Sequence, residues 1–293
     1  MKLTFLGTGT SHGVPVIACD CPVCKSKDIH DKRLRSSAYV ETCDGFSIQI
    51  DVGPEFRIQA LENNIKKIDA VLLTHGHADH LFGLDDLRIF SCDFKNRPDT
   101  LKSQEILAAP PLPIYTNKNC LEDIKVRFNY IFMPPKEGGG HAKLDLKEAK
   151  EAFYIGKTKI LPIPMMHGHL ETSGWLLTEK GQNEGQKSIA YLTDCNFISD
   201  DSIELIRQNC GNLKHLIIDA LRVKEHSTHF NFLQAMQVCQ KIGVAEHVWF
   251  IHMTHNHSHK EIISYIQENL KDFPALQKAE SVLPAYDKLE IET

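Results

Sequence analysis

Four side chains that can bind metal ions occur in the stretch THGHADH at positions 74–80. If this stretch is extended, His75, His77 and Asp79 project to one side because side chains alternate along an extended chain, while His80 turns away. That arrangement suits two adjacent metal ions better than one. Imidazole and carboxylate ligands together favour Zn, Mn or Fe, since Ca and Mg sites are built from oxygen. The alternative is a polar loop whose Asp79 caps a helix that begins near Leu81.

Three more potential ligands follow apolar runs that have the composition of strands. His167 follows residues 160–166, Asp194 follows 189–193, and His252 follows 248–251. Each of these residues taken singly also suits a turn or a helix cap. Together with positions 75–80, they predict one shared site at the ends of several strands, where a layered α/β fold places its chemistry.

The cysteines form a second pattern. Three of the nine lie in the six-residue stretch from Cys19 through Cys21 to Cys24, and the other six are scattered. Such clustering is typical of metal binding in a reducing compartment rather than of disulfides. Three thiolates are one ligand short of a closed tetrahedral zinc site, so the fourth ligand must come from elsewhere.

Composition restricts the classes of function. A hydrophobic content of 42% over 293 residues is enough for a sizeable core. The 33 Lys and Arg against 38 Asp and Glu give a net charge of −5, which provides no broad basic surface, so a long nucleic acid is not an expected partner. Glycines interrupt residues 1–17 and no run of 18 apolar residues occurs. We therefore expect a soluble cytoplasmic protein with no membrane partner.

Hydrophobic periodicity predicts the elements that must position these residues. The expected strands cover residues 2–6, 37–42, 46–52, 68–73, 158–164, 174–178, 188–193, 215–219 and 247–251. The expected helices cover residues 54–63, 84–90, 117–132, 202–210, 230–242 and 260–270. Because strands and helices alternate without a linker, we expect residues 1–293 to form a single α/β domain with helices on the outer faces of its sheet. Residues 93–113 and 134–141 are expected to be surface excursions, the second a lid candidate.

The stretch at positions 74–80 resembles the His-x-His-x-Asp-His signature of the metallo-β-lactamase superfamily, and His167, Asp194 and His252 fall in that family's order. The resemblance implies a four-layer αββα sandwich with a binuclear metal site. It also implies that His75, His77 and His167 bind the first metal, that Asp79, His80 and His252 bind the second, and that Asp194 bridges them. Cys195, beside Asp194, is not expected to be a ligand.

The cysteine cluster is similar to that of the PhnP family of phosphoribosyl cyclic phosphodiesterases, in which a histidine close to the last metal ligand accompanies it. His255 is therefore the best candidate for the fourth zinc ligand. The stretches at positions 7–9, 13–15 and 228–229 strengthen this resemblance. The family histidine that matches His229 lies by the substrate and is a candidate general acid, whereas a capping or packing role is the alternative. His226, His257 and His259 are expected to be solvated or outside the ligand shell, and His169 could stabilise the loop after His167.

We expect a phosphodiesterase that hydrolyses a small phosphate ester, with a cyclic ester as the favoured form. The expected cofactors are two catalytic divalent metals, Zn or Mn, and one structural Zn. Two metals about 3.5–4 Å apart would activate a bridging water, and His229 and Asp79 would take part in catalysis. A tRNA 3′-end endonuclease and a biosynthetic or binding protein like the pyrroloquinoline-quinone B protein are the alternatives. The sequence is compatible with a homodimer and does not fix the oligomeric state.

Overall fold

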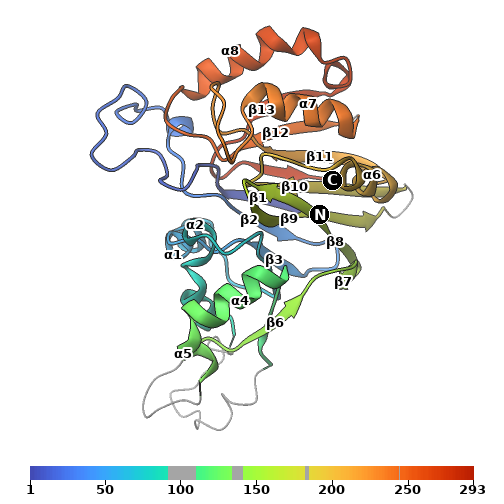
Figure 1. Ribbon diagram of the computed structural model, residues 1–293. Helices are drawn as coiled ribbons and strands as arrows, with labels where there is room; N and C mark the ends of the chain where they lie inside the picture. The colour runs from blue at the N-terminus through green and yellow to red at the C-terminus, as the bar shows by residue number, and fades with distance from the viewer. Residues whose placement is uncertain (92–109, 134–140, 182–184, 244) are drawn as a thin grey trace.

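The computed structural model describes residues 1–91, 110–133, 141–181, 185–243 and 245–293 (Figure 1). Within them the strands form two seven-stranded sheets. The first sheet has the order β14-β1-β2-β3-β4-β5-β6, with β14 Glu290–Glu292, β1 Lys2–Gly7, β2 Ser37–Glu41, β3 Ser47–Ile50, β4 Ala70–Leu72, β5 Leu112–Thr116 and β6 Leu144–Glu148. The second has the order β13-β12-β11-β10-β9-β8-β7, with β13 Ser281–Pro284, β12 His247–Ile251, β11 Asn212–Asp219, β10 Gln186–Leu192, β9 Leu170–Lys180, β8 Thr158–His167 and β7 Phe153–Ile155.

Helices cover the outer face of each sheet. The first sheet carries α1 (Phe56–Glu62), α2 (Ala78–Leu81), α4 (Lys118–Arg127) and α5 (Asn129–Phe132), and the second carries α6 (Asp200–Asn209), α7 (Phe232–Ile242) and α8 (His259–Asn269). Figure 1 shows α7 and α8 beyond one sheet and α1, α2 and α4 beyond the other. This is the predicted αββα sandwich. No helix among the described residues is long and apolar enough to cross a membrane.

The layers are held by three apolar clusters, one between the sheets and one under each set of helices. Phe5 and Ile48 of the first sheet and Trp175, Tyr191 and Ile217 of the second are fully buried between the sheets. Truncating such a core side chain costs about 2–5 kcal/mol, because it removes apolar burial and leaves a cavity. This packing fixes the relative positions of the strand ends that carry the site.

Several predicted elements differ from the structure. Residues 84–90 form a 3₁₀ helix, Leu84–Ile89, rather than an α-helix. The predicted helix over 117–132 breaks at Phe128, whose φ of −116° and ψ of 33° are not helical, and so becomes α4 and α5. The prediction also lacked β5, β6, β7, β13 and β14, which are three to five residues long. β5, β6, β13 and β14 pair with strands far away in the chain, which local periodicity does not report, whereas β7 pairs with the neighbouring β8.

The two predicted excursions lie largely outside the described residues, which omit 92–109 and 134–140. Residues 110–113 of the first predicted excursion are described. The prediction is wrong for Leu112 and Pro113, because β5 begins at Leu112 and pairs with both β4 and β6. Leu112 and Ile114 are buried under the outer helices of the first sheet. Pro113 sits in β5, where its partner Asp145 belongs to the edge strand β6.

Candidate metal centre

The sequence-predicted ligands come from the ends of strands in both sheets. In the first sheet, residues 75–80 follow β4. In the second, His167 ends β8, Asp194 follows β10 by two residues and His252 directly follows β12. A hydrogen bond of 2.9 Å from the Ser173 backbone N–H to the Thr74 carbonyl ties the two sheets beside this edge. The interlocked strand ends thus bring residues that are up to 177 positions apart into one site.

The ligand stretch is only partly extended. It leaves β4 as a loop, but α2 begins at Ala78, so Asp79 and His80 stand on a four-residue helix. The expectation that Asp79 continues the alternation of His75 and His77 is therefore wrong. His77 is the N-cap of this helix, yet its side chain makes no capping bond. The turn of the helix directs Asp79 and His80 toward the second sheet.

Histidines from both sheets form a first group of ligand atoms. A nitrogen of each of His75, His77 and His167 lies within 4.8 Å of the other two. His75 and His167 are buried, and His77 is exposed. Nδ1 of His167 lies 2.7 Å from the Thr228 carbonyl oxygen, so Nδ1–H donates to it and Nε2 is left as a lone-pair ligand.

A second group surrounds Asp194, which is buried. The Oδ2 atom of Asp194 lies 3.0 Å from Nε2 of His80 and 3.1 Å from Nδ1 of His252. Oδ2 of Asp79 lies 3.1 Å from Nε2 of His80. Ligand atoms of Asp79, Asp194 and His252 lie within 4.8 Å of one another, and so do those of His75, His80 and Asp194. Asp194 is therefore shared by the groups on both sides of it.

Asp51 binds the ring nitrogen of His80 that points away from Asp79 and Asp194. It is fully buried, and its Oδ2 accepts a 2.7 Å hydrogen bond from Nδ1 of His80. Thr74 donates to both carboxylate oxygens, from its backbone N–H at 2.8 Å and its hydroxyl at 2.9 Å. Carboxylates behind a ligating imidazole fix its tautomer and raise its basicity. Nε2 of His80 is thereby directed at Asp79 and Asp194.

The site suits cations. Nε2 of His75 is buried and lacks a hydrogen-bond partner among the described residues, although buried polar atoms are nearly always satisfied. Burial alone would lower the pKa of His80, but Asp194, Asp79 and Asp51 outweigh it and raise that pKa well above its usual value. Burial would raise the pKa of Asp194, but His252 and His80 hold it well below its usual value. Divalent cations coordinated by nitrogen and oxygen would satisfy all these groups.

His229 lies beside the ligands but is held by a different carboxylate. Its Nδ1 is 2.7 Å from Oδ2 of buried Asp219, at the end of β11, and its ring centroid is 4.4 Å from that of His167. A ligand atom of His229 lies within 4.8 Å of those of His167 and Asp194. Burial opposes a positive charge on His229, but Asp219 outweighs it and raises the pKa of His229 to about 9. His229 is not a helix cap, because Asn231 caps α7.

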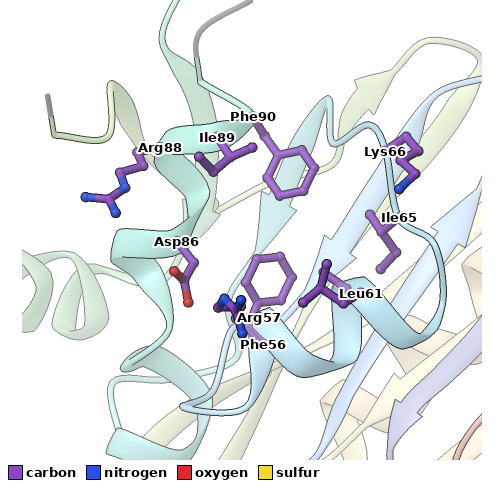
Figure 2. A pocket seen from close by; sticks show the side chains of 10 residues that line it. Phe56, Arg57, Leu61, Ile65, Lys66, Asp86, Arg88, Ile89 and Phe90 are labelled. Atoms are coloured by element: carbon purple, nitrogen blue, oxygen red, sulfur yellow. The ribbon is translucent and has the colours of Figure 1, made fainter. Parts of the chain in front are cut away.

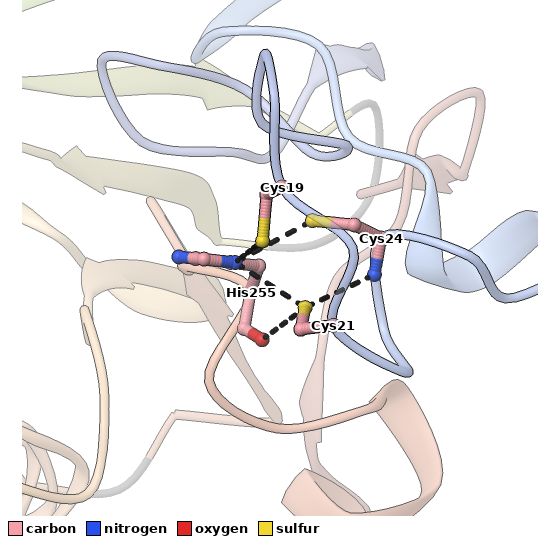
Figure 3. Close-up of side chains that lie close together, drawn as sticks. All are labelled: Cys19, Cys21, Cys24 and His255. Atoms are coloured by element: carbon pink, nitrogen blue, oxygen red, sulfur yellow. Dashed lines mark hydrogen bonds between the residues drawn. The ribbon is translucent and has the colours of Figure 1, made fainter.

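The second cluster joins residues from opposite ends of the chain (Figure 3). Nδ1 of His255 lies 3.4 Å from Sγ of each of Cys19, Cys21 and Cys24, and Figure 3 shows the four side chains pointing toward one another. A hydrogen bond from the backbone N–H of Cys24 to the Cys21 sulfur contributes most to lowering the pKa of Cys21 to about 6. Three thiolates and an imidazole at one point match a structural zinc site.

The other predicted histidines lie outside these groups. His259 is half-buried with Nδ1 3.0 Å from an Arg33 guanidinium nitrogen, His257 is half-buried, and His169 is exposed. Sequence reasoning did not assign roles to Asp51 and Asp219. The available signal was positional, because each ends a strand at the same edge as the expected ligands.

Comparison with known proteins identifies the family. The β-lactamase superfamily domain model matches residues 47–253. A protein named octanoyltransferase from Porphyromonas gingivalis is 36% identical over 258 residues, 87% of this chain and 46% of that protein. A ribonuclease Z from Borreliella afzelii is 24% identical over 156 residues, 53% of this chain and 46% of that protein. The chain thus spans about half the length of these curated relatives.

Two crystal structures share the whole fold. One, described as a new diphosphatase from the PhnP family, superposes with a TM-score of 0.77 at 36% identity and covers 100% of this chain and 97% of that chain. The other, Zn²⁺-bound PqqB from Methylobacterium extorquens, has a TM-score of 0.72 at 16% identity, with 100% of both chains covered. The family match spans most of this chain and includes positions 75 to 252, so the chain belongs to the β-lactamase superfamily and has the metallo-β-lactamase fold of its hydrolases.

Proposed function

We propose that this protein is a metal-dependent phosphodiesterase that hydrolyses a small phosphate ester, with a cyclic ester as the favoured form. The observation that carries the proposal is the convergence of His75, His167, Asp194 and His229 at one edge of both sheets. The likeness to a PhnP-family diphosphatase at 36% identity over nearly its whole length supports phosphate chemistry.

In this proposal two divalent cations bind at the strand ends. His75, His77 and His167 would hold the first, Asp79, His80 and His252 the second, and Asp194 would contact both. When bound, such a pair activates water and neutralises charge on phosphoryl oxygens. The protein fixes the ligand geometry through Asp51 behind His80 and the Thr228 carbonyl behind His167.

His229 would then protonate the departing oxygen. Asp219 binds Nδ1 of His229, so Nε2 is the atom available to a substrate. The ring lies against His167 and stacks on His252 at 4.7 Å between centroids, and these contacts with one proposed ligand of each metal support that role. In this proposal a proton on Nε2 would pass to the leaving oxygen of a phosphate bound at this edge of the two sheets.

We also propose that residues 1–293 form a single domain. β1 near the start of the chain pairs with β14 near its end, and Leu3 and Ile291 share the apolar cluster between the sheets with Trp175. Neither sheet could bury its inner face without the other. A single cooperative transition in thermal unfolding followed by two spectroscopic probes would support one domain, whereas two separated transitions would contradict it.

A substrate panel tests the reaction class. It contains bis-p-nitrophenyl phosphate, ribose 1,2-cyclic phosphate, 2′,3′-cyclic nucleotides, an octanoyl thioester, a β-lactam and a pre-tRNA, each assayed with Zn²⁺ and with Mn²⁺. We expect hydrolysis of the small phosphate esters. Activity confined to the thioester or lactam would overturn the proposal, and cleavage of the pre-tRNA alone would favour the endonuclease alternative.

The cysteine cluster gives a prediction about stability. Cys21→Ser should remove one tightly bound zinc per chain, because thiolate binding free energy becomes folding free energy at a closed site. We expect the melting temperature to fall by at least about 5 °C, on a scale of about 2–4 °C per kcal/mol. Elemental analysis and thermal unfolding measure both effects. Exposed Cys43→Ser is the matched control. Unchanged zinc and melting temperature in the Cys21 variant would defeat the zinc assignment.

The buried carboxylate behind His80 gives a prediction about metal affinity. In Asp51→Asn, one of the two side-chain oxygens is replaced by an N–H₂ donor, so the side chain cannot accept from both His80 Nδ1 and the Thr74 backbone N–H. We expect the weaker catalytic metal to bind roughly 10–100-fold less tightly, the usual effect of removing such a partner. Competition against a chelator measures it, with Asp69→Asn as the control. Affinity equal to that of the parent protein would show that Asp51 does not support the ligand.

A further inference from the structure

The loop over residues 226–229 is anchored at every residue. The Ser227 carbonyl accepts a 2.9 Å bond from the Asn196 amide, and the Thr228 carbonyl accepts a 2.7 Å bond from His167. His229 is held by Asp219 at 2.7 Å. The side chain of His226 is bound to Thr228. The loop therefore presents its two histidine rings in fixed orientations.

The contacts of His226 determine which of its nitrogens carries a proton. Nδ1 lies 3.3 Å from the Thr228 backbone N–H and 3.2 Å from the Thr228 hydroxyl. A backbone N–H can only donate, so Nδ1 accepts and the proton of the neutral ring lies on Nε2. Burial, followed by the nearby His229, lowers the pKa of His226, which agrees with a neutral ring. Among the described residues Nε2 has no hydrogen-bond partner, so it presents a free donor.

This donor lies one ring further from the proposed metals than His229. The centroid of His226 is 5.3 Å from that of His229, which in turn lies 4.4 Å from His167. His226 is half-buried, whereas His167 and His229 are buried, so the row of rings runs from the ligands toward solvent. A leaving group that extends past His229 along this row would meet Nε2–H of His226.

We propose that His226 is a specificity-determining residue whose Nε2–H donates a hydrogen bond to an acceptor oxygen on the leaving group, with a second phosphoryl group as the best acceptor. This inference rests on the phosphodiesterase function proposed above. His226 lies outside both ligand groups. A purely structural role for His226 would need only Nδ1, which accepts from Thr228, and would leave the Nε2–H donor without a function.

Two substitutions separate these roles. His226→Asn keeps an acceptor for the Thr228 N–H, because an asparagine side chain bonds the backbone N–H two residues on, but it loses the distal donor. His226→Gln carries an N–H₂ donor near the position of Nε2. His257→Asn is the control for a half-buried histidine outside the loop. Kinetics are measured on ADP-ribose, whose leaving group carries phosphoryl oxygens, and on bis-p-nitrophenyl phosphate, whose leaving group carries none.

We expect His226→Asn to lower kcat/KM on ADP-ribose by about 10–100-fold, the worth of a hydrogen bond to a charged acceptor. Its kcat/KM on bis-p-nitrophenyl phosphate should stay within about twofold of the parent value, and His226→Gln should recover part of the ADP-ribose rate. Metal content should not change in either variant. Equal losses on both substrates, or no loss on either, would overturn the inference.

Binding distinguishes this inference from the proposed function. Titration of the metal-loaded protein with AMP and with adenosine 5′-(α,β-methylene)diphosphate should show tighter binding of the diphosphonate, and His226→Asn should abolish that preference. If the parent protein hydrolysed no phosphate ester, the proposed function would fail while this titration still tested His226. Equal affinity of the parent protein for the two ligands would overturn the role of His226, whatever the turnover.

Discussion

Asp194→Ala is expected to remove both catalytic metals together. Its carboxylate lies 3.0 Å from His80 and 3.1 Å from His252, and it shares a ligand group with His75 as well. A carboxylate between two cations serves both, and its loss also leaves their mutual repulsion uncompensated. Removing a residue that only supports a metal ligand already lowers activity by about 10–100-fold. Because Asp194 is proposed to be a ligand itself, we expect turnover to fall by more than about 100-fold.

Metal content decides this prediction. Elemental analysis of the purified variant should find fewer than one catalytic equivalent per chain, while the zinc of the cysteine cluster stays bound. Asp201→Ala is the matched control, because Asp201 is an exposed aspartate on α6 close to Asp194 in sequence. Circular dichroism establishes that both variants are folded. Two retained catalytic equivalents in Asp194→Ala would mean that Asp194 is not the bridge.

His229→Ala should give the second large effect. The variant is expected to keep every metal, because the ring of His229 is bound by Asp219 and does not belong to the proposed ligand set. Its turnover should fall by a factor of roughly 10²–10⁴, the usual contribution of a positioned proton donor. Turnover is measured on a phosphate ester with an alkoxide leaving group. Metal analysis of the same preparation separates a lost proton donor from a lost cation.

The leaving group provides the control for His229. A nitrophenolate departs without a proton, whereas a sugar alkoxide is far more basic and needs one. The loss should therefore be much smaller on bis-p-nitrophenyl phosphate than on ribose 1,2-cyclic phosphate. Equal losses on the two esters would indicate that His229 binds phosphate instead. Full activity on both would mean that His229 takes no part in the reaction.

The sequence by itself determined the kind of site and most of the elements around it. The spacing of His75, His77, Asp79 and His80 after an apolar run indicated a metal site on residue types alone, since few other arrangements need three imidazoles and a carboxylate together. The long periodic segment that forms α7 was also predicted, because its periodicity is a property of neighbouring residues. The cysteine spacing predicted thiolate ligation for the same reason.

The tertiary structure alone decided which carboxylates support the site. Asp51 reaches His80 across 29 residues, and Asp219 reaches His229 across 10. It also decided that Asp79 stands on α2 rather than on an extended segment, and that residues 112–116 form a strand between β4 and β6. These features depend on how two sheets pack against each other. Such packing is governed by contacts between residues far apart in the chain, and local spacing carries no record of them.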